Sequence, residues 1–238
     1  MVKKGRDFSD LTIIIPTLNE VENVGRILSA IRKLYYNSYV IVSDDGSEDG
    51  TAGVVRRVSR NDRRIMLLDR KKNPVKGLTA SVVDAALLTK TDKIVVMDAD
   101  MQHPVELVGR ISDSLESCDL CVGVRTTVRK WGFFRRVLSK GISYFSFFVF
   151  VIRGKITCND MMSGFFGIGG DLFRGTIKKN RKGFVYKGYK VLLDTMRMLD
   201  KNSTRVGELP YATFHDREAG KSKLRFRRML EVVESTLK

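Results

Sequence analysis

Short apolar runs alternate with amphipathic stretches through the first half of the chain. The runs expected to form strands are Leu11–Ile15, Tyr39–Val42, Ile65–Leu68 and Lys93–Met97. Between them, apolar residues recur at helical spacing over Asn23–Leu34, Thr51–Val58 and Leu78–Leu88. Strands separated by helices of this length indicate βαβ units and a buried, mainly parallel sheet. We therefore predict an α/β fold whose central sheet is flanked by helices.

The pattern changes from Arg125 onward. Residues Arg129–Ile152 predict one long helix, with an apolar face formed by Trp131, Phe134, Leu138, Phe145, Phe148 and Ile152 and basic side chains on another face. Such a helix is typical of an interfacial membrane segment, and equally of a helix packed on the core. A loop over 158–168, a helix over Lys187–Leu199 and a strand near Val206–Leu209 are expected to follow.

The charge is divided unequally along the chain. The 238 residues carry a formal net charge of +16, and 43% of them are apolar, which excludes a disordered chain. Residues 1–124 hold 18 basic and 18 acidic side chains, whereas residues 125–238 hold 25 basic and 9 acidic ones. This asymmetry predicts an anionic partner: nucleic acid, a phosphorylated ligand or an anionic membrane surface. With no linker or repeat, we expect one domain, 1–238, with a neutral half (1–124) and a basic half (125–238).

Cysteine usage and hydropathy restrict the setting. The three cysteines, Cys118, Cys121 and Cys158, follow no signal peptide and indicate a reducing compartment with buried thiols. With only two histidines, a structural zinc site at the C-x-x-C is disfavoured. The longest apolar run, 142–152, is shorter than the roughly 20 residues of a spanning helix. We expect a peripheral protein, and an anchor beyond Lys238 stays open.

Acidic and amide side chains collect after three of the predicted strands. The segments are PTLNE at 16–20, DDGSEDGT at 44–51 and DADMQHP at 98–104. Ligands of open α/β sheets bind at the carboxyl ends of the strands, where these loops are expected to meet. Asp98 and Asp100 offer hard oxygen ligands for Mg²⁺ or Mn²⁺, although an acidic turn that caps the next helix explains them too.

The second of these loops offers a carboxylate for a base or a ribose. Asp45 is the better candidate if Asp44 turns away to cap its own loop. Turn and helix-cap roles account for such residues individually. Three such loops at one sheet edge favour a binding site.

Motifs that run in order from Leu11 to Leu224 carry a family resemblance. Besides the three loops they are Lys76-Gly77-Leu78, Gly123-Val124-Arg125, Asp160 with Ser163-Gly164-Phe165, Gly188-Tyr189-Lys190, Glu208-Leu209-Pro210 and Arg217 with Gly220-Lys221-Ser222-Lys223-Leu224. Together they resemble family 2 glycosyltransferases of GT-A fold, a Rossmann-like nucleotide-sugar transferase domain. Within that family the motifs look most like those of the polyprenyl (dolichyl) phosphate mannose synthases.

The resemblance implies roles for individual residues. It implies that the base and ribose are held by Pro16, Leu18, Glu20, Ser43 and Asp45. It assigns Asp98 and Ala99 to the nucleoside side, and Asp100 with Gln102 to a divalent cation on the diphosphate. The implied contacts to donor phosphates and sugar are Arg125, Lys190, Arg217 and Lys223. The acceptor phosphate is expected at Arg135 and Ser139. The candidate catalytic residues are Asp98, Asp100, Arg125 and Arg217.

The resemblance also implies a reaction. A polyprenyl phosphate oxygen attacks the anomeric carbon of a nucleotide sugar, most simply mannose from GDP-mannose, with inversion, while Mg²⁺ or Mn²⁺ and basic side chains stabilise the leaving diphosphate. A phosphate nucleophile is ionised at pH 7, so no strong general base is needed, and His103 and His215 are expected to be structural.

Alternatives remain open at this stage. The family often has Tyr at Leu18 and Val at Ser43, so the base is undecided and a UDP-sugar such as UDP-glucose stays possible, as does a soluble acceptor. A basic nucleic-acid-binding protein is the reading from another class, although no nucleic-acid-binding motif accompanies the charge. The basic half is expected to meet the cytoplasmic face of an anionic membrane. The oligomeric state is not predicted.

Overall fold

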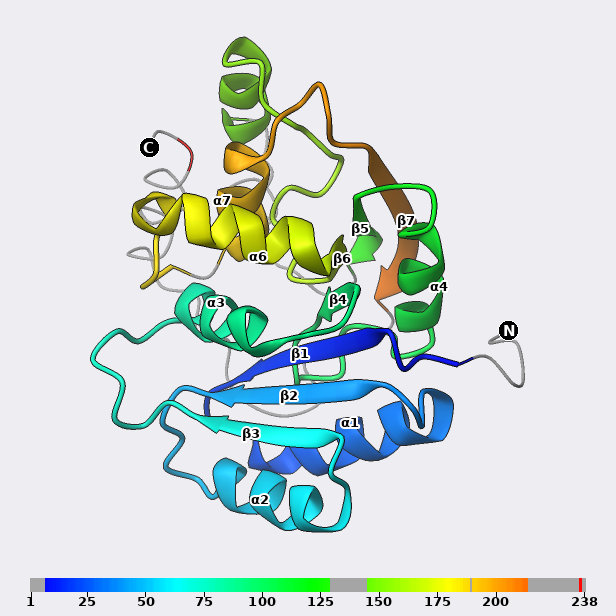
Figure 1. Ribbon diagram of the computed structural model, residues 1–238, viewed down its shortest axis with the longest axis vertical. Helices are drawn as coiled ribbons and strands as arrows, with labels where there is room; N and C mark the ends of the chain where they lie inside the picture. The colour runs from blue at the N-terminus through cyan, green and yellow to red at the C-terminus, as the bar shows by residue number, and fades with distance from the viewer. Residues whose placement is uncertain (1–6, 129–144, 189, 214–235, 237–238) are drawn as a thin grey trace.

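The computed structural model describes residues 7–128, 145–188, 190–213 and 236. Within these residues the chain forms one seven-stranded sheet with the order β3-β2-β1-β4-β6-β5-β7 (Figure 1). The strands are β1 (Leu11–Thr17), β2 (Tyr39–Asp44), β3 (Ile65–Asp69), β4 (Lys93–Val96), β5 (Leu120–Val128), β6 (Phe166–Gly169) and β7 (Val206–Thr213). In this sheet only β6 runs antiparallel to its neighbours. The predicted α/β class with a mainly parallel sheet is confirmed.

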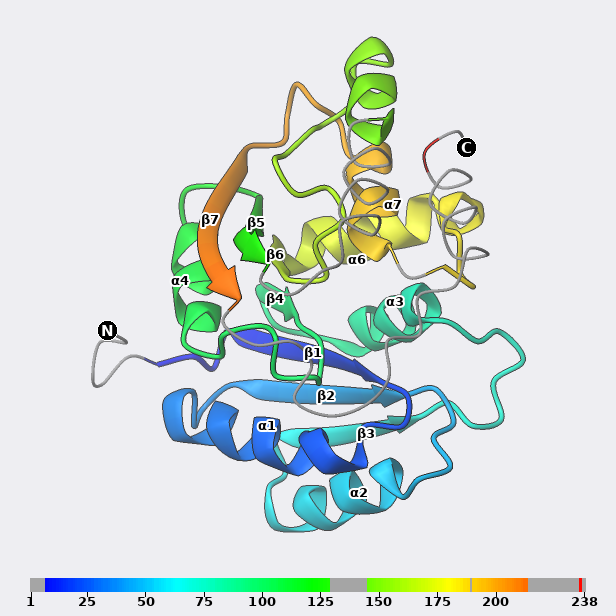
Figure 2. The same ribbon diagram turned by 180° about the vertical axis from the view of Figure 1, so that it is seen from behind.

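Helices cover both faces of the sheet (Figures 1 and 2). One face packs against α1 (Val21–Leu34), α2 (Thr51–Asn61) and α4 (Leu107–Ser114). The other packs against α3 (Leu78–Leu88), α6 (Gly170–Lys179) and α7 (Val191–Met198). Since successive strand side chains point to opposite faces, Ile13 and Ile15 join the first core and Ile14 the second, and all three are fully buried. This explains the continuous apolar run of β1.

The structure corrects the bounds of two predicted segments, the loop over 158–168 and the helix over Lys187–Leu199. The loop expected over 158–168 is wrong at its end, because Phe166–Gly169 pairs with both β4 and β5. The helix expected from Lys187 begins at Val191. The residues before it serve α3, since the carbonyl oxygens of Tyr186 and Gly188 accept hydrogen bonds from the first N–H groups of that helix.

The long helix predicted over Arg129–Ile152 falls mostly outside the described residues. Residues 145–152 are described and helical. Among the described residues, no helix combines the length and apolar character needed to cross a membrane.

The cysteines are packed in the interior. Cys118, Cys121 and Cys158 are free thiols, all buried as expected. Burial raises the pKa of Cys121 and Cys158 to about 12, so both stay protonated and unreactive at neutral pH.

Candidate functional site

The loops after β1 and β2 are joined to each other by hydrogen bonds. Asn19 adopts a left-handed conformation with φ 55°, which its short polar side chain tolerates. Its backbone N–H donates to Ser47 Oγ at 2.8 Å, and its side-chain oxygen accepts the N–H of Glu48 at 2.9 Å. The N–H of Glu20 donates to Thr51 Oγ1 at 2.9 Å. Together the two loops form one connected rim at the carboxyl edge of the sheet.

Asp44 caps its own loop. Its buried carboxylate accepts hydrogen bonds from Thr17 Oγ1 and from the N–H of Ser47, both at 2.9 Å. The condition under which Asp45 is the better candidate is therefore met, and Asp45 remains the predicted ligand carboxylate of this loop.

Asp45 is held by Arg70, a residue that the sequence analysis missed. The guanidinium of Arg70 is ion-paired with Asp45 and also donates to Asp84 at 2.9 Å and to Ser81 Oγ at 2.9 Å. The other carboxylate oxygen of Asp45 accepts the N–H of Gly77 at 2.7 Å. Burial raises the pKa of Asp45, against the opposing effects of Gly77 and Arg70. Arg70 follows β3 at the same sheet edge as the three predicted loops, which is the signal that points to it.

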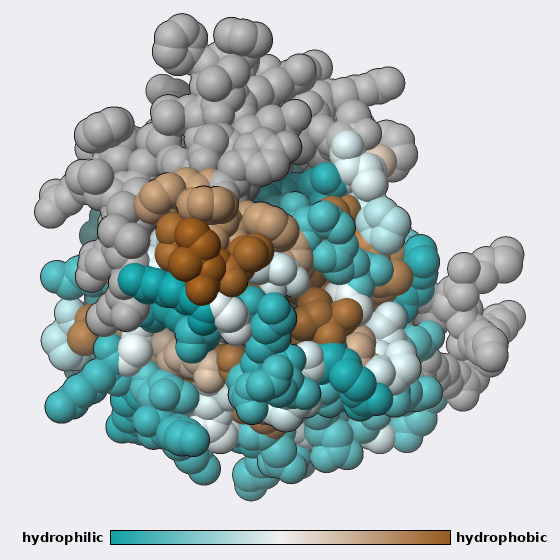
Figure 3. All heavy atoms as spheres, turned by 90° about the horizontal axis from the view of Figure 1, so that it is seen from above, coloured by the Kyte–Doolittle hydropathy of each residue, from teal (hydrophilic) through white to brown (hydrophobic). Residues whose placement is uncertain are grey.

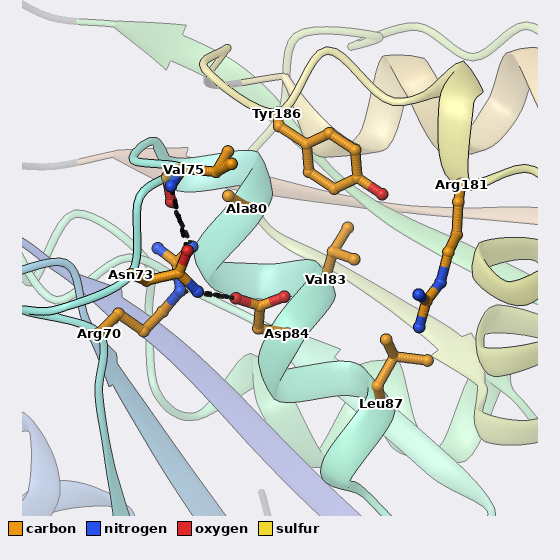
Figure 4. A pocket seen from close by; sticks show the side chains of 9 residues that line it. All are labelled: Arg70, Asn73, Val75, Ala80, Val83, Asp84, Leu87, Arg181 and Tyr186. Carbon is orange, nitrogen blue, oxygen red and sulfur yellow. Dashed lines mark hydrogen bonds and ion pairs between the residues drawn. The ribbon is translucent and has the colours of Figure 1, made fainter.

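Arg70 also lines a hollow of about 220 Å³. Figure 4 shows Arg70 on one side of this hollow and Arg181 with Tyr186 on the other, above Val83 and Leu87 of α3. Arg70 is thus shared between the hollow and the loop that carries Asp45.

The loop after β4 presents the predicted acidic pair. Met101 has φ 62°, which makes the turn tight, and the buried Asp100 accepts the N–H of Gln102 at 3.2 Å. His103 is buried beneath, and its Nδ1 accepts the N–H of Asp98 at 3.0 Å. The proton of the neutral ring therefore lies on Nε2, 3.8 Å from Asp98 Oδ2. The structural role expected for His103 is confirmed by this contact.

The segment before β6 supports the acidic pair from below. The ring of Phe165 stacks on His103, with centroids 4.9 Å apart and an interplanar angle of 11°. A Cβ atom on Gly164 would lie 3.1 Å from Asp98 Oδ2. A side chain at position 164 would contact the carboxylate of Asp98 too closely, so the glycine at this position provides the space that the carboxylate occupies.

Two basic side chains lie beside the acidic loop. Arg125 at the end of β5 donates from Nε and Nη2 to the two carboxylate oxygens of Asp160, at 2.7 and 2.9 Å. Burial acts to lower the pKa of Arg125, but its hydrogen bonds with Asp160 raise it overall. Lys190 Nζ donates to the carbonyl of Met162 at 2.6 Å. Burial and the charge of Arg125 lower the pKa of Lys190 from 10.5 to about 8.

The donor set suits a hard divalent cation that shares its coordination with a ligand. Asp98, Asp100 and Gln102 offer carboxylate and amide oxygens within one turn. In the part of the chain that the structure describes, no three His, Cys, Asp or Glu side chains gather as a complete metal site. Mg²⁺ and similar ions keep waters and take phosphate oxygens beside one or two carboxylates, so these residues fit such a cation together with a diphosphate.

The other predicted residues fall into two groups. Pro16 and Ser43 are buried at the ends of β1 and β2, Ala99 is buried in the acidic loop, and Leu18 is exposed. The predicted residues outside the described part are Arg135, Ser139, Arg217 and Lys223. His215 lies outside it as well. The ligand contacts of both groups remain predictions.

Comparison with known proteins identifies the family. Glycosyl transferase family 2 matches residues 12–174, which include all three acidic or amide loops and Arg125. The chain belongs to this family. The match ends within α6, so β7 and the residues after it lie beyond it.

Similarity to two named enzymes extends over more of the chain. A dolichol-phosphate mannosyltransferase of Pyrococcus furiosus is 30% identical over 93% of this chain and 61% of its own length. A polyprenol monophosphomannose synthase of Mycolicibacterium smegmatis is 30% identical over 89% of this chain and 80% of its own. This chain thus spans less than two thirds of the Pyrococcus protein.

A solved structure supports the fold. Glucosyl-3-phosphoglycerate synthase of Mycobacterium tuberculosis, in complex with Mn²⁺, UDP-glucose and phosphoglyceric acid, superposes with a TM-score of 0.67. The match covers 99% of this chain and 80% of the other at 18% identity. At that identity the likeness shows the shared GT-A architecture.

Proposed function

We propose that this glycosyltransferase moves a hexose, mannose from GDP-mannose, onto a polyprenyl phosphate at the membrane surface. The observation that carries the proposal is that Asp98 and Asp100 lie at the same sheet edge as Arg125 and Lys190. The chain is also 30% identical to a dolichol-phosphate mannosyltransferase and to a polyprenol monophosphomannose synthase. The acidic pair suits a cation on the donor diphosphate, and the two basic side chains suit its phosphates. Asp45 and the rim beside it serve the nucleoside.

The reaction requires the protein to stabilise negative charge and to position the reactants, and it does not require a general base. The C–O bond between the sugar and the nucleoside diphosphate breaks as an acceptor phosphate oxygen bonds to the anomeric carbon, with inversion. A bound Mg²⁺ or Mn²⁺ supplies Lewis acidity at the leaving diphosphate. Arg125, oriented by both oxygens of Asp160, and Lys190 stabilise the same developing charge. Arg217 and Lys223 are proposed to act with them, and Arg135 with Ser139 to hold the acceptor phosphate.

An exposed apolar face favours an acceptor in the membrane. In the helix 145–152, the outward side chains of Phe145, Phe147, Phe148, Val151 and Ile152 are 42 to 68% exposed. Figure 3, which views this end of the molecule, shows apolar side chains gathered at the surface. Aromatic and aliphatic side chains beside a basic sequence suit the headgroup region of an anionic bilayer. We infer that the enzyme works on the cytoplasmic face.

Transfer of labelled sugar to lipid tests the function. The protein is incubated with GDP-[¹⁴C]mannose, dolichyl or undecaprenyl phosphate and either Mn²⁺, Mg²⁺ or EDTA, and the organic phase is counted. We expect labelled lipid with either metal, none with EDTA, and a loss of at least about 100-fold with Asp100→Asn. Asp113→Asn, on α4, serves as the matched carboxylate control and is expected to retain activity.

Parallel reactions address the alternatives. UDP-[¹⁴C]glucose replaces the donor in one, and 3-phosphoglycerate replaces the lipid in another. Transfer to 3-phosphoglycerate without transfer to lipid would overturn the acceptor assignment. Faster lipid labelling from UDP-glucose than from GDP-mannose would overturn the donor assignment.

A further inference from the structure

Tyr211 on β7 lies beside Arg125 in the sheet. The two residues are partners in the parallel register of β5 and β7. The Tyr211 ring meets His103 and Phe165 edge-on, at centroid distances of 6.2 and 5.7 Å. A Cβ on Gly123 would stand 3.2 Å from Tyr211 Cε1, so the absence of a side chain there makes room for the ring. Tyr211 is therefore fixed beside His103 and Phe165, which support the acidic loop, and beside Arg125.

The hydroxyl group of Tyr211 has no hydrogen-bond partner among the residues that the structure describes, although it is buried and the side chain is only 6% exposed. An unpaired buried hydroxyl destabilises the folded state, and such groups usually have a function or a missing partner. Tyr35 shows the ordinary arrangement. Its buried hydroxyl donates to the carbonyl of Val105 at 2.9 Å and accepts the N–H of Gly109 at 3.0 Å.

The charges around Tyr211 define what the hydroxyl can do. Burial raises its pKa above the ordinary value of 10; Arg125 opposes this, and Asp160, Asp98 and Asp100 add to it. The group is thus a neutral hydrogen-bond donor at physiological pH. It also lies within electrostatic reach of both carboxylates of the acidic loop. A hydroxyl in this state can donate to an oxygen acceptor that comes within hydrogen-bond distance of it.

We propose that Tyr211 is a donor-binding residue, whose hydroxyl donates a hydrogen bond to an oxygen of the nucleotide sugar held at Asp98 and Asp100. Two oxygen acceptors of the donor fit this description, a diphosphate oxygen and a sugar hydroxyl. The inference deepens the proposed function and rests on it. None of the family motifs recognised in the sequence includes Tyr211, since the nearest one ends at Pro210.

Tyr211→Phe removes the hydroxyl and keeps the ring contacts with His103 and Phe165. We expect the dissociation constant of GDP-mannose, measured by calorimetry with Mn²⁺, to rise about 10-fold, as loss of one hydrogen bond predicts, and the constant of GDP is measured beside it. The thermal midpoint of the ligand-free protein is expected to be unchanged or slightly higher. Tyr35→Phe is the matched control, expected to lower the midpoint because its hydroxyl is paired, while both dissociation constants stay as in the wild type.

The two ligands separate the two acceptors. Weaker binding of both GDP and GDP-mannose assigns the hydroxyl to the diphosphate, and weaker binding of GDP-mannose alone assigns it to the sugar. Wild-type affinity for both ligands in Tyr211→Phe would overturn the inference, as would a lower midpoint without ligand. If the wild type binds UDP and UDP-glucose but neither guanine ligand, the proposed donor fails and the same comparison is made with the uridine pair. If it binds none of the four, both proposals fall.

Discussion

Asp160 binds Arg125 through both carboxylate oxygens, with Nε–Oδ2 and Nη2–Oδ1 distances of 2.7 and 2.9 Å. The pair joins the segment before β6 to the second half of β5, so Asp160 positions a basic side chain that lies beside the acidic loop. Planar, two-point pairing fixes the guanidinium in direction as well as in place. Asp160 thus holds the guanidinium of Arg125 in a set orientation, as the proposed contact of Arg125 with the donor phosphates requires.

Asp160→Asn should therefore impair catalysis. An amide cannot supply two anionic oxygens, so Arg125 loses its orientation and its countercharge. We expect kcat/KM for lipid mannosylation to fall about 30-fold, equivalent to about 2 kcal/mol. Asp119→Asn is the control, because Asp119 pairs with the largely exposed Arg205 and is expected to change the rate less than twofold. Equal rates for the two variants would contradict an orienting role.

Lys190 should make donor binding depend on pH. Its pKa in the folded protein is about 8, so the ammonium loses its proton as pH rises through 8. We expect the dissociation constant of GDP-mannose to increase between pH 7 and 9. Stability changes in the opposite direction: between 8 and 10.5 the unfolded chain holds this proton more tightly, so the free energy of unfolding increases with pH.

Lys190→Arg isolates this titration. Arginine keeps its charge throughout the range, so the dissociation constant in the variant should stay level from pH 7 to 9. Calorimetry at five pH values for both proteins makes the comparison. A pH dependence that persists in Lys190→Arg assigns the titration to another group.

Arg70→Met should destabilise the protein. The Arg70 side chain is 2% exposed and bonds Asp45, Asp84 and Ser81, so its loss leaves the partly buried Asp45 without the countercharge of the guanidinium. We expect the free energy of unfolding to fall by about 3 kcal/mol in urea titration. Asp84→Asn, at a carboxylate that is 37% exposed, should cost about 1 kcal/mol or less. Similar losses in both variants would argue against Asp45 as the main partner.

The sequence predicted β1 to β4 and α1 to α3 because their apolar strands alternate with helices of regular spacing. It did not predict α4 or β5. It also missed β6, whose four residues include two glycines, and α6, which also carries two. Such short, glycine-containing segments are stabilised by tertiary pairing rather than by local pattern.

The same contrast holds for the site. Asp98 and Asp100 were predictable from their place after a strand. The pairings of Arg70 with Asp45 and of Asp160 with Arg125 join residues 25 and 35 positions apart and depend on how the loops fold back. Tyr211 was not predicted as a site residue, because a tyrosine in an apolar strand is most simply explained as a core residue.

Ser43→Ala should show whether a buried hydroxyl at the end of β2 serves the ligand. Ser43 Oγ is buried without a partner in the described parts of the chain, so its removal should leave the free energy of unfolding unchanged or slightly higher. We expect the dissociation constant of GDP to increase about fivefold if the hydroxyl binds the nucleoside. Ser38→Ala is the control: its hydroxyl donates to the carbonyl of Tyr35 at 2.8 Å, so it should lose about 1 kcal/mol without a change in affinity. Unchanged GDP affinity in Ser43→Ala would remove this side chain from the site.

The apolar face of the helix 145–152 should bind membranes. Phe148 and Ile152 are 64 and 68% exposed, and burial of such side chains in a bilayer is worth roughly 1.5–3 kcal/mol each when complete. We expect Phe148→Ser with Ile152→Ser to reduce flotation with phosphatidylserine-containing liposomes at least tenfold, and added salt to weaken binding of the wild type, because the basic half contributes by charge. Leu88→Ser, at a 49% exposed residue on α3, controls for the loss of surface hydrophobicity and should float as the wild type does. Equal flotation of the double variant and the wild type would show that another surface meets the lipid.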